Sequence, residues 1–232
     1  MNELPIVLLD LDDTLLDFKK AEHIAICRTF RDFGLEPTAE LTARYSEINA
    51  MQWKRLELGE INRQQVLEGR FQILFEEQGL HIEPSLAKSK YEAYLSQGHY
   101  FIPGAEELLE ELHGKYRLFL CSNGTAVVQA GRLESAGIGP YFEKIFISED
   151  IGHNKPDTRY FEACFDQIPG FDRKRCVMVG DSLSSDILGG IKAGIKTCWF
   201  DPRHKGSSGD ICPDCTIYEL SQLMEALDTL FA

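Results

Sequence analysis

Three kinds of residue pattern are scarce or missing in this chain of 232 residues. No apolar run approaches the ~20 residues of a membrane-spanning helix, so we expect no membrane segment. Basic residues are few, with 24 Lys and Arg against 37 Asp and Glu. Because nucleic acid phosphates require a basic surface, we expect no nucleic acid polymer as a partner. The six histidines show no metal-ligand spacing.

A disulfide framework is also missing. The seven cysteines lie mostly in apolar segments, where Cys behaves as a small hydrophobic residue, and an odd, irregular set favours a reducing compartment. The first residues lack the basic segment of a secretory signal, so we expect a cytoplasmic protein. Cys212 and Cys215 form the one close pair. With no second pair and no His partner, we interpret them as a surface turn rather than a metal or redox site.

The hydrophobic fraction of 44% and the charged fraction of 26% are those of an ordinary globular protein. Short apolar segments alternate with amphipathic ones after residue 116, and this alternation is typical of βαβ units around a parallel sheet. The expected strands are residues 117–121, 144–147, 176–179 and 197–200. The expected helices are residues 126–135, 158–168, 186–193 and 220–231. The fold class is therefore α/β.

Residues 18–97 follow a different pattern, with no convincing strand. Helical periodicity there is interrupted near Gly34, Gly59, Gly79 and Pro84, which predicts four helices in a bundle. We therefore expect a core domain made of residues 1–17 and 98–232, with a helical cap domain, residues 18–97, inserted after the first strand.

The most informative segment is the first strand and the acids that follow it. The apolar run at residues 6–9 is typical of a buried parallel strand, and ligands bind beyond the carboxyl ends of such strands. Asp10 and Asp12 should therefore lie together at that edge, where two carboxylates ~4 Å apart repel by roughly 4 kcal/mol at an effective dielectric near 20. A divalent cation such as Mg²⁺ would offset this repulsion. The adjacent Asp13 is better interpreted as a helix or turn cap.

Other polar residues follow later strands, so we expect them at the same edge of the sheet. They are Ser122, Asn123, Lys155, Asp181 and Asp186. Such a set suits phosphoryl transfer through an aspartyl phosphate, in which a carboxylate attacks phosphorus and a metal ion bridges nucleophile and phosphate. A second carboxylate can exchange protons with the leaving group and with water. Hydroxyl, N–H and lysine groups can bind the phosphate oxygens.

These segments resemble, in order, the four sequence motifs of the haloacid dehalogenase (HAD) superfamily of phosphohydrolases. The matching segments are Asp10-Leu-Asp12-Asp13-Thr14-Leu15, Ser122-Asn123-Gly124, Lys155-Pro156, and Gly180-Asp181-Ser182 with Asp186. The match spans nearly the whole chain. The resemblance implies a Rossmann-like parallel sheet, a helical cap of type C1 and Mg²⁺ as cofactor.

The resemblance also implies roles for individual residues. Asp10 is expected to be the nucleophile and Asp12 the general acid/base. Asp10, Asp181 and the backbone carbonyl of Asp12 are the expected metal ligands. Asp186 is expected to support the metal site from outside the ligand shell, or to cap a helix. Lys155 is an expected catalytic residue, which would also bind phosphate together with Ser122 and Asn123.

A finer resemblance concerns the substrate. Residues 180–194, residues 197–199 and the cap segment 53–71 are similar to the YjjG-type branch of pyrimidine 5'-nucleotidases, which implies a nucleoside monophosphate as substrate. We expect Trp53 and Arg70 to contact it by base stacking and by phosphate or base contacts. The alternative is that Trp53 packs in the cap core and Arg70 is solvated.

Other functions remain open at this point. Within the fold, the chain could be a phosphatase of phosphoglycolate or of a sugar phosphate, or a phosphoglucomutase. A dehalogenase is disfavoured, because that chemistry needs neither an acid at Asp12 nor Mg²⁺. From a different class, the chain could be a non-catalytic module that binds a phosphate ligand. We expect a monomer or a weak homodimer.

Overall fold

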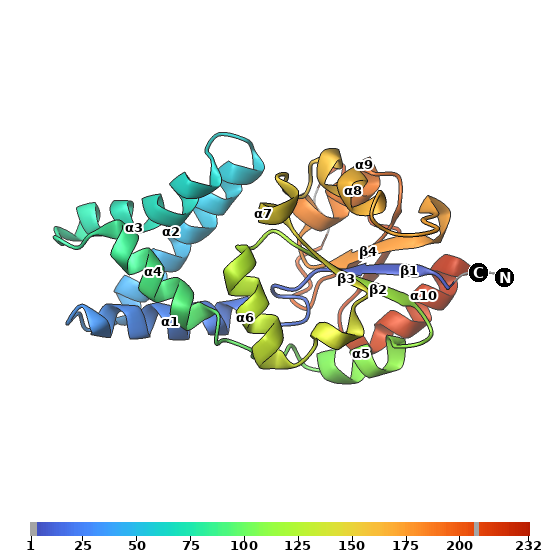
Figure 1. The fold of residues 1–232 in the computed structure, drawn as a ribbon, viewed down its shortest axis with the longest axis horizontal. Coiled ribbons are helices and arrows are strands. Elements are labelled where there is room, and N and C mark those ends of the chain that lie inside the picture. The colour runs from blue at the N-terminus through green and yellow to red at the C-terminus, as the bar shows by residue number, and fades with distance from the viewer. Residues whose placement is uncertain (1–3, 207–208) are drawn as a thin grey trace.

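A six-stranded parallel sheet forms the core of the molecule in the computed structural model, which describes residues 4–206 and 209–232 (Figure 1). The strand order is β3-β2-β1-β4-β5-β6. The strands are β1 Ile6–Leu9, β2 Arg117–Ser122, β3 Lys144–Ile147, β4 Cys176–Gly180, β5 Lys196–Phe200 and β6 Cys215–Ile217. The predicted Rossmann-like α/β sheet is confirmed.

The order of the strands determines where a ligand can bind. From β1 the sheet continues to β2 and β3 on one side and to β4, β5 and β6 on the other. The reversal of order at β1 leaves a crevice beyond the carboxyl ends of β1 and β4. Leu9 is in register with Leu120 of β2 and Val179 of β4, so residues that follow these three strands meet at the crevice.

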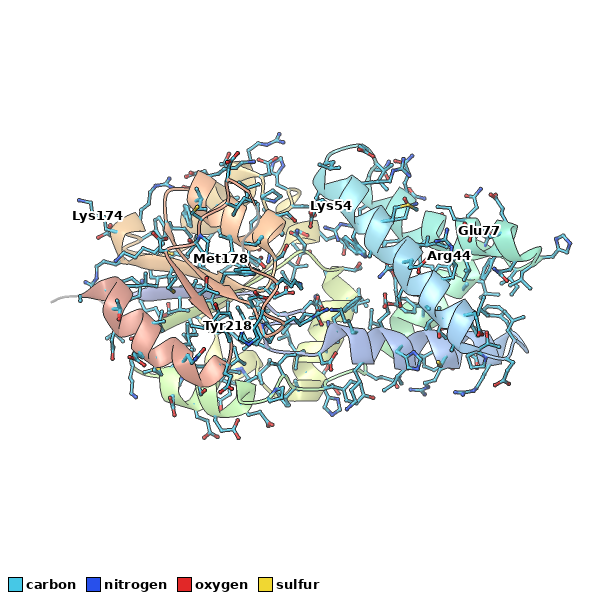
Figure 2. The ribbon with its side chains drawn as sticks, turned by 180° about the vertical axis from the view of Figure 1, so that it is seen from behind. Arg44, Lys54, Glu77, Lys174, Met178 and Tyr218 are labelled. Atoms are coloured by element: carbon cyan, nitrogen blue, oxygen red, sulfur yellow. The ribbon has the colours of Figure 1, made fainter. Side chains whose placement is uncertain are left out.

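Helices cover both faces of the sheet (Figure 1). Because successive strand residues point to opposite faces, Val7 and Leu9 pack in one cluster with α5 and α10, whereas Leu8 packs in another with α8. Met178 of β4, labelled in Figure 2, belongs to the second cluster. The core helices are α5 Ala105–Leu112, α6 Ala126–Ala136, α7 Ser148–Ile151, α8 Thr158–Phe165, α9 Leu188–Lys192 and α10 Leu223–Phe231.

Four further helices lie beside the carboxyl edge of the sheet and enclose a separate hydrophobic cluster. These cap helices are α1 Phe18–Asp32, α2 Ala39–Glu57, α3 Arg63–Gln78 and α4 Pro84–Leu95. Tyr45 packs its ring 5.2 Å from that of Phe71 and 5.4 Å from that of Tyr91. On the outer surface, Arg44 of α2 makes a two-pronged ion pair with Glu77 of α3, both labelled in Figure 2.

Local sequence signals define the ends of the cap helices. Asp17, Thr38 and Asn62 accept hydrogen bonds from the first turns of α1, α2 and α3, as expected of N-cap residues. Asn62 forms a reciprocal capping box with Gln65. Gly79 ends α3 with a φ of 63°, a left-handed conformation that glycine adopts at little cost.

Two neighbouring backbone segments connect the cap helices to the core. Asp17 N donates to Tyr100 O at 2.7 Å, and Ile102 N donates to Leu15 O at 2.9 Å. The backbone at Gly98 also lies close to α1, since a Cβ there would be 2.7 Å from the Cβ of Ala21. The predicted boundaries, after residue 17 and before residue 98, fall within these two segments and stay a prediction.

The structure corrects or extends the expected elements at several places. A π-helical turn, Leu183–Ile187, precedes α9 where a single helix was expected, and a 3₁₀ turn, Leu220–Gln222, precedes α10. Cys215 is not part of a surface turn but begins β6, in register with Cys198. The sequence also predicts a surface loop at residues 206–210, of which residues 207 and 208 lie outside the described residues. No described helix is long and apolar enough to cross a membrane.

The short strand β6 is stabilised by side chains that a sequence pattern does not reveal. Asp214 Oδ2 accepts a hydrogen bond from Thr197 N at 2.7 Å, and Asp214 N donates to Thr197 Oγ1 at 3.1 Å. These bonds attach the chain to β5 just before β6 begins. Three residues are too few to show an alternating pattern, so the interpretation of this segment as a turn was wrong at Cys215.

Candidate active site

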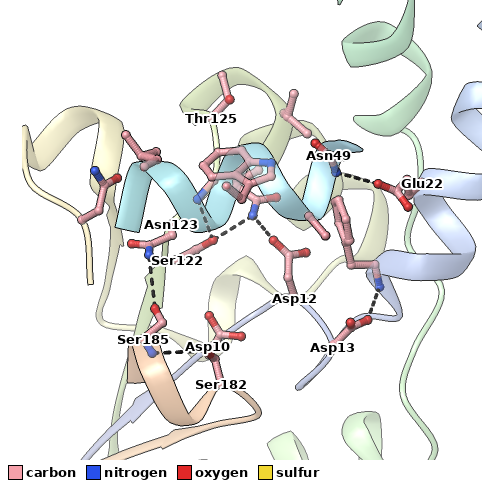
Figure 3. Close-up of a pocket in the computed structure, with 18 of the residues that line it drawn as sticks. Asp10, Asp12, Asp13, Glu22, Asn49, Ser122, Asn123, Thr125, Ser182 and Ser185 are labelled. Carbon is pink, nitrogen blue, oxygen red and sulfur yellow. Dashed lines mark hydrogen bonds between the residues drawn. The ribbon is translucent and has the colours of Figure 1, made fainter. Parts of the chain in front are cut away.

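A cavity of about 500 Å³ lies between the cap helices and the carboxyl edge of the sheet. Its core wall contains the residues that follow β1, β2 and β4, together with α6 and the loop around Lys155. Its cap wall comes from α1, α2, α3 and α4. Figure 3 shows the polar side chains of this cavity pointing toward one another from the two sides. The predicted core residues are therefore brought together in one place.

Asp10 is held in a fixed orientation at the end of β1. Its backbone N donates to Val179 O at 3.0 Å, which keeps it beside β4. One carboxylate oxygen accepts the Thr14 hydroxyl at 3.2 Å, and the other accepts Lys155 Nζ at 2.7 Å. The side chain is buried within the cavity. These contacts are typical of a nucleophile whose rotamer must be defined before a substrate binds.

The ammonium group of Lys155 lies among three oxygen atoms of the site, although the residue is 1% exposed. Its Nζ lies 2.7 Å from Asp10 Oδ1, 2.6 Å from the carbonyl oxygen of Cys121 and 2.7 Å from Asp186 Oδ1. The contacts with Asp10 and Cys121 are hydrogen bonds, and the contact with Asp186 is an ion pair. Burial opposes its protonation, but the charges of Asp10 and Asp186 outweigh burial and raise the pKa of Lys155 above its ordinary value. The lysine therefore stays charged inside the site.

Asn123 fixes the loop that carries this lysine. Its Nδ2 donates to Lys155 O, and its Oδ1 accepts from Lys155 N, both at 2.9 Å. The same Nδ2 donates to Ser185 Oγ at 3.2 Å. The side chain of Asn123 thus positions Lys155. The predicted phosphate contact of Asn123 would then be made by its backbone N–H.

Ser122 is the last residue of β2, at the base of the cavity. Its hydroxyl accepts from Gly124 N at 3.2 Å and from Gln129 Nε2 at 2.8 Å. A Cβ at Gly124 would lie 2.4 Å from the Gln129 amide, so a larger residue at this turn would displace the Gln129 side chain. The turn leaves Ser122 on the cavity wall, where its predicted phosphate-binding role is sterically possible.

Asp10, Asp181 and Asp186 offer carboxylate oxygens that all lie within 4.8 Å of one another. Asp181 follows β4, where its N donates to Thr14 Oγ1 at 3.1 Å. Asp186 accepts Ser182 N at 3.1 Å. It approaches the backbone of Gly180 so closely that a Cβ there would lie 2.3 Å from its carboxylate. An all-oxygen donor set of this kind is what Mg²⁺ prefers.

The charges of these acids are strongly coupled. Burial, followed by repulsion from Asp10 and Asp186, raises the pKa of Asp181 to about 9. Burial also raises the pKa of Asp10 to about 7, because Lys155 only partly offsets it and Asp186 and Asp12 repel it. A divalent cation among the three acids would supply the missing positive charge. The residues present therefore fit Mg²⁺.

The side chains of Asp12 and Asp13, both in the first motif, bond different parts of the structure. Both oxygens of Asp12 are bonded from α6, one by Gln129 Nε2 at 2.6 Å and the other by Arg132 Nη1. Asp13 has a φ of 60° and accepts from Phe18 N at 3.1 Å. Asp13 therefore caps the start of α1, as the sequence indicated. Asp12 stays on the cavity wall, where a general acid/base is needed.

Both predicted cap residues, Trp53 and Arg70, line the cavity. Arg70 is 2% exposed, so the alternative of a solvated arginine is wrong. Its Nη1 donates to Asn49 Oδ1 at 2.9 Å, and Asn49 Nδ2 donates to Glu22 Oε1 at 2.6 Å. Its guanidinium carbon lies 4.7 Å from the centre of the Tyr91 ring.

Sequence reasoning missed Arg63, the first residue of α3, which connects the cap to the core. Its guanidinium donates to Gly124 O at 2.8 Å, to Ser148 Oγ at 2.5 Å and to Asn154 Oδ1 at 2.7 Å. These acceptors lie in three separate core segments. The available signal was a basic residue in a first helical turn, where the helix dipole disfavours positive charge.

Gln129 and Arg132 were also missed. They lie three residues apart on α6, so they share the helix face that meets Asp12. The sequence predicted this helix but gave no sign that its polar face turns toward the site. The pairing of buried Arg132 with half-buried Asp12 depends on how α6 packs against the loop after β1.

Comparison with known proteins agrees with this geometry. Residues 4–194 match the family model of the haloacid dehalogenase-like hydrolases. The chain therefore belongs to the haloacid dehalogenase-like hydrolase family and is an enzyme.

Individual relatives match over nearly the full length. The chain is 37% identical to the pyrimidine 5'-nucleotidase PynA of Streptococcus pneumoniae (strain ATCC BAA-255 / R6), covering 96% of this chain and 94% of the relative. It is 33% identical to the pyrimidine 5'-nucleotidase YjjG of Escherichia coli (strain K12), covering 95% of this chain and 96% of the relative. A crystal structure of the HAD-hydrolase YfnB from Bacillus subtilis bound to magnesium superposes with a TM-score of 0.92 at 36% identity, over 98% of this chain and 100% of that chain.

We expect Mg²⁺ to stabilise the folded protein through the acidic cluster. Ligand at about 100 times its Kd adds about 2.7 kcal/mol to the free energy of unfolding, and differential scanning fluorimetry would record this as a rise in Tm. Asp181→Asn should remove most of the rise. Asp166→Asn, the same change at an exposed position, should keep it. An undiminished rise in Asp181→Asn would show that Mg²⁺ binds elsewhere.

We expect Arg63→Ala to loosen the cap, because it removes three hydrogen bonds between α3 and the core. Small-angle X-ray scattering should give a larger radius of gyration for this variant than for the unaltered protein. Arg44→Ala is the matched control, since Arg44 pairs with Glu47 and Glu77 of the cap and should leave the radius unchanged. Equal radii for all three proteins would show that Arg63 does not hold the cap closed.

Proposed function

We propose that this hydrolase is a magnesium-dependent phosphomonoesterase that forms an aspartyl phosphate on Asp10, with pyrimidine nucleoside 5'-monophosphates as substrates. The observation that carries the proposal is the buried Lys155, which bonds Asp10 and Asp186 beside the cluster of acids. A fixed carboxylate, a permanent cation and a magnesium-type donor set are the three parts that phosphoryl transfer to aspartate requires.

The first half of the proposed reaction transfers the phosphoryl group to the enzyme. A carboxylate oxygen of Asp10 forms a bond to phosphorus while the bond from phosphorus to the ester oxygen breaks. Asp12, in its acid form, gives its proton to the departing alkoxide. Magnesium, held by Asp10, Asp181 and the backbone carbonyl of Asp12, would offset negative charge on the phosphoryl group, with Asp186 supporting these ligands.

The second half hydrolyses the aspartyl phosphate. Asp12, now a carboxylate, takes a proton from water as the water oxygen bonds to phosphorus. The bond from phosphorus to Asp10 breaks, so phosphate leaves and both acids regain their starting forms. Throughout, the Ser122 hydroxyl, the backbone N–H of Asn123 and the ammonium of Lys155 would bind the non-bridging oxygens.

The cap wall supports a nucleotide as the substrate. Trp53 offers an aromatic ring for stacking on a base, and Arg70 is fixed by Asn49, by the carbonyl of Leu67 and by the Tyr91 ring. Two of the five N–H donors of Arg70 are used in these bonds. The remaining donors suit the carbonyl oxygens of a pyrimidine. Two relatives of this chain are named pyrimidine 5'-nucleotidases, which favours the same substrate class.

Two alternatives remain distinguishable. A phosphatase of phosphoglycolate or of a sugar phosphate would use the same core residues but would not need the ring of Trp53. A non-catalytic phosphate-binding module would not need Asp12 beside the nucleophile.

Because the YfnB crystal structure is described as revealing interdomain movement, we infer that the cap of this protein also moves to admit substrate.

The nucleophile assignment predicts the effect of removing Asp10. The unaltered protein with Mg²⁺ should release phosphate from pyrimidine nucleoside monophosphates faster than from phosphoglycolate or sugar phosphates. Asp10→Asn should lower kcat by at least about 10³-fold, because the amide is a poor nucleophile. Asp166→Asn should be unaffected. Unchanged activity in Asp10→Asn would contradict the nucleophile assignment, and a preference for sugar phosphates would contradict the nucleotidase assignment.

The base-stacking role predicts a selective loss in Trp53→Ala. Stacking is worth about 1–3 kcal/mol per base, so KM for a nucleoside monophosphate should rise about 5-fold or more. KM for p-nitrophenyl phosphate should change little, since this small ester reaches the core without the base site. Trp53→Phe keeps a ring and should retain most of the affinity. Equal losses on both substrates would show that Trp53 serves packing instead.

A further inference from the structure

Arg132 of α6 is a buried cation with a structural connection to the general acid/base. It is 0% exposed and is, by residue volume, the largest fully buried side chain among the described residues. Its Nη1 bonds Asp12 Oδ1 and also donates to Gln129 Oε1 at 3.1 Å. Its Nε donates to the carbonyl oxygen of Gly98 at 3.0 Å. The guanidinium thus spans from the segment that leaves the cap to the carboxylate of Asp12.

Gln129, also on α6, bonds the second carboxylate oxygen of Asp12. Its Nε2 donates to Asp12 Oδ2 at 2.6 Å and to Ser122 Oγ at 2.8 Å. Each oxygen of Asp12 therefore has its own donor on α6. Figure 3 shows the Asp12 carboxylate turned toward the amide that bonds it and away from Asp10. The rotamer of Asp12 is set by these contacts rather than by Asp10.

Stability alone does not account for a buried arginine here. Replacing a buried ion pair by apolar residues of similar volume is often neutral or stabilising. In addition, Nη2 of Arg132 is buried without a hydrogen-bond partner among the described residues, and the residue lines the cavity. An unpaired buried donor costs free energy, so the arginine is better explained by what it does to Asp12.

We propose that Arg132 is a positioning residue, which holds Asp12 where it can protonate the leaving oxygen of the substrate. This inference rests on the proposed phosphomonoesterase function. Arg132 forms no bond to the reacting atoms. It fixes Asp12 through a charge-assisted bond, and its own position is fixed by the backbone of Gly98 and by Gln129.

The leaving group distinguishes this role from a structural one. A nucleoside leaves as an alkoxide, which is strongly basic, so breaking its ester bond requires the proton of Asp12. p-Nitrophenol leaves as a stable anion and needs no proton. Misplacing Asp12 should therefore slow phosphoryl transfer from a nucleotide far more than from p-nitrophenyl phosphate, whereas a general loss of folding slows both equally.

The experiment measures kcat with Mg²⁺ for one pyrimidine nucleoside monophosphate and for p-nitrophenyl phosphate. General acid catalysis contributes about 10²–10⁴-fold, so Arg132→Lys should lower kcat for the nucleotide at least about 30-fold. Under conditions where phosphorylation of Asp10 limits turnover, p-nitrophenyl phosphate should lose less than about 3-fold. Single-turnover mixing gives this condition directly. Equal losses on the two substrates would overturn the proposal.

A double-mutant cycle provides the second measurement. On an Asp12→Asn background, Arg132→Lys should lower nucleotide turnover no further, because the group it positions is already absent. If the double variant instead loses turnover by the product of the two single-variant losses, the proposal is overturned. If Arg132→Lys does not fold, as shown by its thermal unfolding, Arg132→Gln takes its place. That variant removes the charge-assisted bond to Asp12, leaves the bond between Gln129 and Ser122 in place, and should show the same dependence on the leaving group.

The outcomes also separate this inference from the proposed function. If the enzyme prefers a sugar phosphate to any nucleotide, the nucleotidase assignment fails, but the sugar also leaves as an alkoxide. The comparison with p-nitrophenyl phosphate is then made with that substrate and is equally decisive. If the protein hydrolyses no phosphate ester with Mg²⁺, both the proposed function and the role of Arg132 are overturned.

Discussion

The ion pairs of Lys155 are the interaction on which the rest of the site depends. Lys155 is buried and bonds Asp10, Asp186 and the carbonyl of Cys121. Removing one partner of a buried ion pair is strongly destabilising, so the ends of β1 and β2 and the segment after β4 must stay together. The strand order brings these segments to one crevice. Asn123 bonds the backbone N–H and carbonyl of Lys155, which holds the loop of the lysine beside the end of β2.

The cap has a hydrophobic cluster of its own and is joined to the core by separate contacts. Its helices enclose their own aromatic cluster, so the cap can keep its shape while its position relative to the core changes. Polar contacts connect the two parts: Arg63 bonds three core segments, and Ser184 donates to Glu57 at 3.2 Å. Val128 of α6 also packs in the hydrophobic cluster of the cap. The polar contacts can break and form again at modest cost, since water replaces each lost partner.

The sequence was sufficient to predict the fold class and the core of the site. The apolar runs at residues 6–9 and 144–147 match β1 and β3, because buried parallel strands have a strong local signature. Asp10 and Lys155 meet because strand ends converge in a parallel sheet. Arg63 and Arg132 could not be predicted, since Arg63 bonds Gly124, 61 positions away, and Arg132 bonds Asp12, 120 positions away. Their roles depend on how helices pack, which local periodicity does not specify. Cys215 was misassigned for a related reason: β6 is held by Asp214 and Thr197.

The central claim is that Asp10, fixed by Lys155, becomes covalently phosphorylated. Acid quenching of a single turnover, followed by mass spectrometry of the peptide that contains Asp10, tests this claim most directly. Asp12→Asn is the suitable protein for this measurement, because the intermediate should persist when the base that activates water is absent. The account predicts a phosphoryl group on Asp10 when p-nitrophenyl phosphate, whose leaving group needs no acid, is mixed with this variant and Mg²⁺. Release of p-nitrophenol without phosphorylated Asp10 would contradict it.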